Sequence, residues 1–78
     1  MREKKLWLVV TFHTTAAAMA MEKHCKARGV EGRLGPIPRE LLSDCGMAWR
    51  APLVCRAELE QIAAEHGIEV QEFAEIWI

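Results

Sequence analysis

The chain opens with a run of apolar residues and continues with a segment whose apolar positions recur at helical spacing. The β-branched and aromatic stretch Leu6–Phe12 predicts a first strand. His13-Thr14-Thr15 then offers a helix N-cap, and the strong helix formers of 16–28 predict a helix. Gly29 follows at the position where a left-handed residue commonly ends a helix. One apolar stripe of this helix should face the core: Ala18, Met21 and Cys25.

The middle of the chain predicts two short strands joined by a polar loop. Residues 30–34 predict the second strand. Pro36 and Pro38 end it, because proline cannot sit inside a central ladder. Residues 39–45 then form a loop or a helical turn, and residues 46–51 predict the third strand.

The last third of the chain predicts one more helix and one more strand. Val54–His66 has helical spacing and stops at Gly67, and residues 68–78 predict a strand that is clearest from residue 73 onward. The helix should turn three residues inward: Leu59, Ile62 and Ala63. The resulting order, β-α-β-β-α-β, matches the ferredoxin-like split βαβ motif, an α+β fold. We therefore expect one domain over residues 1–78, with a four-stranded antiparallel sheet in strand order 4-1-3-2 and two helices on one face.

The composition of the chain excludes several classes of protein. Apolar residues make up 51% of it and charged residues 27%, as in globular domains. The net charge of −1 comes from mixed signs, whereas a nucleic-acid binder would show a basic stripe. No apolar run reaches the roughly 18 residues of a membrane span, and the first residues lack a signal-peptide layout. The three cysteines form no CxxC pair, so we expect a reducing cytoplasm, no disulfide scaffold, and no metal or other cofactor.

One thiol, Cys45, is singled out by where this topology places it. In a ferredoxin-like sheet the end of the first strand, the start of the first helix and the loop before the third strand share one end. The neighbours of Cys45 should therefore be His13, Thr14 and Thr15. The first amides of the helix carry a partial positive charge there, which favours a thiolate. Arg39 can add a full positive charge from the same loop.

The residues next to Cys45 act in opposite directions on this thiol. Gly46 leaves no side chain beside the sulfur, so backbone or a partner can approach closely. The Asp44 carboxylate disfavours a thiolate unless it points away from the sulfur. Cys25 fits the core, and Cys55 should lie at the opposite end of the sheet. A strand of about 20 Å would separate Cys45 from Cys55, whereas a disulfide needs Cα atoms within about 7 Å.

Two short motifs carry a resemblance to a known family. They are Pro36-Ile-Pro-Arg39 and Ser43-Asp-Cys-Gly46, and the weaker matching positions are Thr11–Thr15, Ala18, Glu22 and Gly29. Here the chain resembles the selenium/sulfur (Se/S) carrier protein-like domain family. The resemblance implies that Cys45 holds sulfur or selenium as a persulfide or perselenide. It also implies a cysteine desulfurase-type donor and an acceptor enzyme as partners. The candidate supporting residues are Arg39, Gly46, Ser43, His13, Thr14 and Thr15.

Three functions remain open for this chain. A carrier is the first, and it would be a substrate of its partners rather than a turnover catalyst. His13 is the only candidate base, and no third group orients it. The second is a regulatory module that binds a small ligand or a partner, because a ferredoxin-like fold does not decide function. The third is a redox sensor that is oxidised on Cys45.

The tryptophans suggest a surface for self-association. Trp7, Trp49 and Trp77 can belong to a sheet face that the helices leave uncovered, and an uncovered apolar face usually finds a partner. We therefore expect a homodimer through that face or through a sheet edge. Scattered surface tryptophans on a monomer are the alternative.

Overall fold

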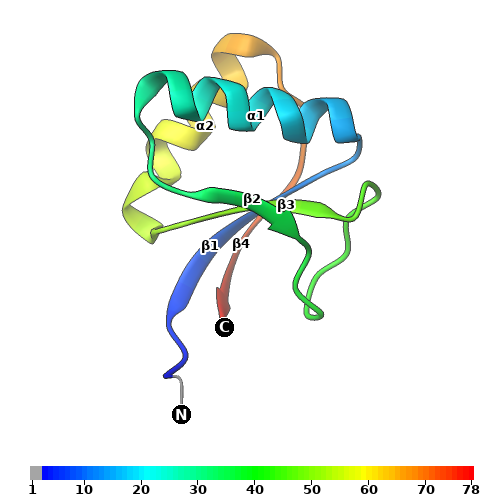
Figure 1. The fold of residues 1–78 in the computed structure, drawn as a ribbon, viewed down its shortest axis with the longest axis vertical. Helices are drawn as coiled ribbons and strands as arrows, with labels where there is room; N and C mark the ends of the chain where they lie inside the picture. Colours follow the sequence, from blue (N-terminus) through cyan, green and yellow to red (C-terminus); the bar gives the residue numbers. More distant parts are fainter. Residues whose placement is uncertain (1–2) are drawn as a thin grey trace.

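A four-stranded antiparallel sheet is the base of the structure, a computed structural model that describes residues 3–78 (Figure 1). Its strands are β1 (Leu6–Phe12), β2 (Arg33–Pro36), β3 (Met47–Ala51) and β4 (Val70–Trp77). They lie in the order β2-β3-β1-β4. Every neighbouring pair is antiparallel. The expected strand order is confirmed, and the fold is α+β and ferredoxin-like.

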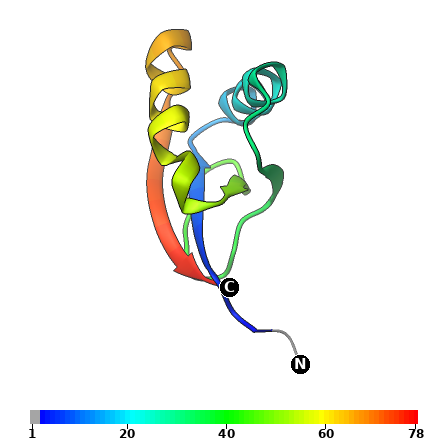
Figure 2. The ribbon, with the colours of Figure 1, turned by 90° about the vertical axis from the view of Figure 1, so that its left-hand side faces the viewer.

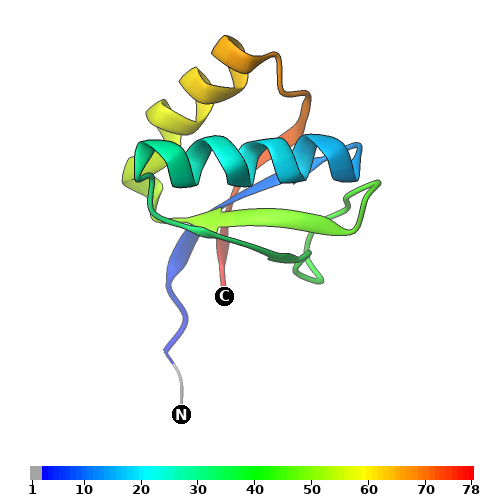
Figure 3. The same ribbon diagram turned by 45° about the horizontal axis from the view of Figure 1, so that its top comes forward.

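Two helices lie together on one side of this sheet, as Figures 1 and 3 show. They are α1 (Thr15–Arg28) and α2 (Arg56–His66), and the short 3-10 turn η1 (Leu53–Cys55) leads into α2. Figure 2 shows α2 running beside β4. Arg56 secures that contact, because its guanidinium reaches Glu75 of β4 at 3.3 Å. No helix within residues 3–78 is long and apolar enough to cross a membrane.

The core lies between the helices and one face of the sheet. Alternate residues of β1 point into it, and Val10 is paired with Trp49 of β3. The buried side chains at its centre are Leu8, Val10, Phe12, Ala18, Met21, Cys25, Trp49, Ala51, Leu59 and Ile62. Ala63 is only partly buried. The apolar stripes expected on both helices therefore face the sheet.

The expectation that Trp49 belongs to the uncovered sheet face is wrong. Trp49 is 2% exposed and packs in the core, because the register puts it opposite Val10 on the helix-facing side. Trp7 lies on the other face, where the Arg50 guanidinium sits 5.3 Å from its ring centroid. Trp77 is paired with Leu6, on the same side of the sheet as Leu8 and Val10, so the expectation is wrong for Trp77 as well, although this side chain is 61% exposed near the end of β4.

Two strands begin later than the apolar pattern predicts, and the reason is the same in both. Val30 donates its backbone N–H to the Cys25 carbonyl at 2.9 Å, and Ile68 donates to the Ala63 carbonyl at 2.9 Å. Each follows a glycine in the left-handed conformation, with φ of 69° at Gly29 and 61° at Gly67. These are helix C-cap contacts, in which an apolar residue after the glycine packs back on the helix. Both residues therefore belong to the helix ends rather than to strands.

Smaller differences occur at the other boundaries. Pro36 is the last residue of β2 rather than a residue beyond it. It is tolerated because β2 pairs with β3 alone, so one side of the strand needs no hydrogen bonds. β3 begins at Met47, one residue after the expected start.

The two helices also contact each other directly. The rings of His24 in α1 and His66 in α2 stack with centroids 3.6 Å apart. Arg28 and Glu65 form an ion pair at 3.0 Å beside them. Burial lowers the pKa of His24, and the nearby charges of His66 and Lys23 lower it further.

Candidate functional site

The loop between β2 and β3 carries Cys45. A backbone hydrogen bond of 3.2 Å from Ile37 N–H to the Gly46 carbonyl closes this loop. Cys45 lies at its end, two residues before β3 begins, and its side chain packs at the margin of the core while remaining partly exposed. Figures 1 and 3 show that this end of the loop lies beside the beginning of α1. The first turn of α1 contains no acidic residue that would neutralise the positive end of its dipole.

Ser43 ties the thiol to the end of β1. Its Oγ lies 3.0 Å from the Phe12 carbonyl oxygen, 3.1 Å from the Met47 carbonyl oxygen and 3.5 Å from Cys45 Sγ. A hydroxyl has one proton and two lone pairs, so it can donate to one carbonyl and accept from the Cys45 thiol. When the sulfur is deprotonated, the same hydroxyl can turn to donate to the thiolate. Ser43 can thus serve both protonation states of Cys45.

His13 and Asp44 hold the loop from outside. His13 Nδ1 lies 2.7 Å from Asp44 Oδ2. The backbone N–H of Asp44 donates to Gln71 Oε1 at 3.0 Å. The His13 side chain therefore pairs with Asp44, the residue next to Cys45 in the chain, and not with the Cys45 sulfur. The Asp44 carboxylate is engaged in this pair and orients the imidazole, so the expectation that no third group orients His13 is wrong.

The two threonines at the start of α1 have a local role. The Thr14 Oγ1 accepts a hydrogen bond of 3.1 Å from Ala17 N–H and caps the helix. Thr15 is the exposed first residue of α1. Thr14 thus fixes the position of the helix end that lies near the loop.

Arg39 and Gly46 complete the set of expected site residues. Arg39 is exposed in a turn of the loop and forms no ion pair with any residue of the described range 3–78. Gly46 has φ of 73°, and a Cβ added there would meet nothing within 4 Å. The left-handed backbone, rather than a lack of space, is therefore what favours glycine at this position.

The other two thiols lie in a different environment. Cys25 and Cys55 are buried, and all three cysteines are free. Burial raises the pKa of Cys25 to about 11, with smaller contributions from Cys55 and Glu58. Burial also raises the pKa of Cys55. Cys45 is the cysteine whose side chain solvent can reach.

One anchoring residue carried no signal in the sequence. Gln71 lies in β4, 27 positions after Asp44, and fixes the loop backbone through its side-chain oxygen. No motif or spacing connects these two positions. Within residues 3–78, no three His, Cys, Asp or Glu side chains are grouped so that they could hold a metal ion.

Comparison with known proteins gives one match. A family model described as Putative Se/S carrier protein-like matches residues 8–75, nearly the whole of the 78-residue chain. No curated protein and no solved structure matches. The matched region begins within β1 and contains both helices and the complete loop that carries Cys45. The chain therefore belongs to the Se/S carrier protein-like family.

Proposed function

We propose that Cys45 accepts a sulfur or selenium atom from a desulfurase-type donor and holds it as a persulfide or perselenide for an acceptor enzyme. The observation that carries this proposal is the contrast among the three thiols. Cys45 is partly exposed on a loop anchored to β1, while Cys25 and Cys55 are buried in the core of a chain that belongs to this family.

The transfer needs no external oxidant or reductant. The Cys45 thiolate attacks the terminal sulfur of a donor persulfide and forms a new S–S bond. The original S–S bond of the donor breaks, and the donor sulfur leaves as a thiolate with the electron pair. A thiolate of the acceptor repeats the reaction on the Cys45 persulfide and restores the Cys45 thiolate. With a perselenide donor, Se–S bonds take the same places.

Three features of the loop support the nucleophile. Ser43 lies 3.5 Å from Cys45 Sγ and can donate to a thiolate. The amino-terminal end of α1 contributes partial positive charge nearby. Arg39 is free of ion pairs within residues 3–78, so its guanidinium is available to an anion on the same loop.

Mass spectrometry after incubation with a cysteine desulfurase tests the proposal. With cysteine as substrate, the chain should gain one sulfur atom on the peptide that contains Cys45, and with selenocysteine it should gain one selenium atom. Cys45→Ser should abolish the gain and leave the fold intact. The matched control is Cys55→Ser, which removes a buried thiol and should retain the adduct on Cys45.

Arg39→Ala should slow formation of the adduct without preventing it, because it removes a charge but not the nucleophile. If Cys45 reacts rapidly with an alkylating reagent but takes up neither sulfur nor selenium from a desulfurase, the carrier proposal is wrong. Such a result, together with reversible oxidation of Cys45 by peroxide, favours a redox sensor.

A further inference from the structure

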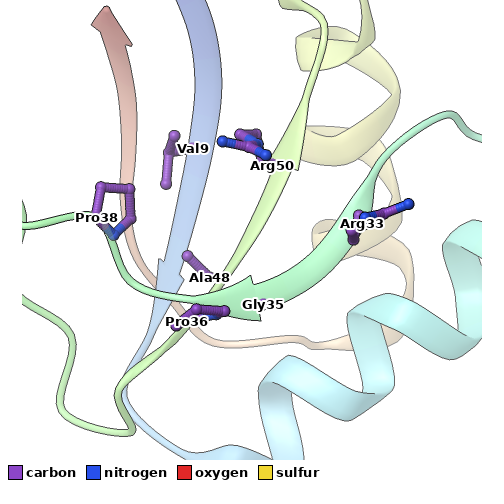
Figure 4. A pocket seen from close by; sticks show the side chains of 7 residues that line it. All are labelled: Val9, Arg33, Gly35, Pro36, Pro38, Ala48 and Arg50. Atoms are coloured by element: carbon purple, nitrogen blue, oxygen red, sulfur yellow. The ribbon is translucent and has the colours of Figure 1, made fainter. Parts of the chain in front are cut away.

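The first apolar residues between β2 and β3 serve the packing of the domain itself. Pro36 and Pro38 border a hollow on the sheet face opposite the helices, where the chain leaves β2 (Figure 4). Val9 and Ala48 line the same hollow, and both are buried although no helix lies on that face. The chain around the two prolines therefore helps to shield this part of the sheet from water.

Leu42, further along the same loop, has no such role. Its side chain is 82% exposed, whereas the preceding Leu41 is partly buried and donates its backbone N–H to the Pro38 carbonyl at 3.1 Å. Leu42 thus holds an apolar side chain in water that the packing of the domain does not use. Burying such a side chain against another apolar surface is favourable.

Leu42 is also held close to the thiol. The next residue, Ser43, lies 3.0 Å from the Phe12 carbonyl oxygen through its hydroxyl, and its own carbonyl accepts the Gly46 N–H at 3.1 Å. The turn that carries Cys45 therefore begins directly after Leu42. Three residues span at most about 11 Å, so the Cα atoms of Leu42 and Cys45 lie within that distance.

A sulfur donor must cover this part of the surface. Cys45 Sγ has to come within bonding distance of the terminal sulfur on a cysteine of the donor enzyme, and an S–S bond is only about 2.05 Å long. Protein–protein interfaces bury about 800 Å² on each partner, which is a patch of roughly 16 Å radius. A patch centred on Cys45 therefore extends as far as Leu42.

We propose that Leu42 is a docking contact for the donor enzyme and enters an apolar recess beside the donor's persulfide-bearing cysteine. The proposal rests on the carrier function proposed above. Arg39 adds charge to the same surface, because it is exposed and forms no ion pair with any of residues 3–78. A guanidinium has five N–H donors, so it can meet a carboxylate at the rim of the recess as well as an anion on its own loop.

Rates of sulfur transfer from a cysteine desulfurase, measured over a range of concentrations of the chain, test the proposal. Leu42→Asn replaces the apolar side chain by a polar one with the same branching, and it should raise KM for the chain about tenfold, which corresponds to about 1.4 kcal/mol. Leu42→Met keeps an apolar side chain of similar volume and should change KM by less than about twofold. The matched control is Val54→Asn. Val54 is 89% exposed but lies in η1, beyond the end of β3 that is remote from Cys45.

A small sulfur donor separates docking from an effect on the thiol. The Cys45 thiolate attacks inorganic polysulfide and gains one sulfur, and the shortened polysulfide leaves with the electron pair. This reaction needs no docking surface, so Leu42→Asn and the unmodified chain should be loaded at equal rates.

Three results would overturn the docking proposal alone: an unchanged KM for Leu42→Asn, an equal rise for Val54→Asn, or a loss for Leu42→Asn that is as large with polysulfide as with the desulfurase. If the desulfurase loads no sulfur on the unmodified chain, the carrier function is wrong and the docking proposal is wrong with it.

Discussion

Removing the Ser43 hydroxyl should loosen the loop that carries Cys45 and lower the stability of the whole domain. The hydroxyl is partly buried and lies within hydrogen-bond distance of the Phe12 and Met47 carbonyl oxygens. The hydroxyl has one proton and donates to one of these two carbonyls at a time, so Ser43→Ala removes one hydrogen bond. The net contribution of such a bond is about 0.5–1.5 kcal/mol, and the loss rises towards about 2 kcal/mol when a partly buried carbonyl is left without its donor. We therefore expect the free energy of unfolding to fall by about 1–2 kcal/mol.

Urea denaturation and thermal unfolding, both followed by circular dichroism, measure this loss. In a domain of this size, 1 kcal/mol corresponds to a change in Tm of about 4–8 °C, so Tm should fall by about 5–15 °C. Thr15→Ala is the control, because it removes an exposed hydroxyl at the start of α1 that has no side-chain partner within residues 3–78. A loss below about 0.3 kcal/mol for Ser43→Ala, or an equal loss for the control, would refute the assignment of Ser43 as the anchor of the loop.

Three further outcomes are expected. Cys45 should alkylate faster at neutral pH than Cys25, because burial holds the pKa of Cys25 at about 11, and peptide mass spectrometry over time checks this; equal rates would contradict it. Below about pH 6.5 the domain should lose stability, because the lowered pKa of His24 means that the folded state binds this proton less tightly than the unfolded chain. Scanning Tm between about pH 7.5 and about pH 5.5 should show the loss, and His24→Gln should reduce its slope; an unchanged slope would exclude His24 as the cause. Gly32→Ala should cost about 1–3 kcal/mol in urea denaturation, because the new Cβ would lie 2.5 Å from Trp49 Nε1 at a φ of 148°; a neutral effect would show that the indole can move aside.

The order of the elements and both helix ends follow from local chemistry and could be predicted. Thr14 and Gly29 bound α1 through capping preferences that act within a few residues. The apolar pattern predicted that β2 and β4 begin too early, at Val30 and Ile68. An apolar residue after a glycine can belong to a helix cap as well as to the start of a strand. Periodicity does not distinguish the two uses. The cap hydrogen bonds to Cys25 and Ala63 decide between them.

Local sequence patterns do not determine on which face of the sheet Trp49 lies. β3 carries apolar residues on both of its faces, so from the sequence alone either face could pack against the helices. The register with β1 decided it, by placing Trp49 opposite Val10. The surroundings of Cys45 follow the same rule. Topology brought its loop to the start of α1, but the pair of His13 with Asp44 depends on contacts across 31 positions of sequence.

In the loop from 37 to 46, the second part is hydrogen-bonded to neighbouring strands and the first part is not. This difference determines which loop residues can be substituted without moving Cys45. Ser43–Gly46 is pinned to β1 by the Ser43 hydroxyl and to β4 by Gln71. Among residues 3–78, no hydrogen bond joins residues 39–42 to a strand; the Leu41 N–H donates to the Pro38 carbonyl at 3.1 Å within the loop itself, and Leu42 is 82% exposed. Insertions or exchanges within 39–42 therefore leave the position of the thiol unchanged while replacing the surface beside it. A library confined to residues 40–42 can vary this surface while retaining Arg39 and without rebuilding the domain.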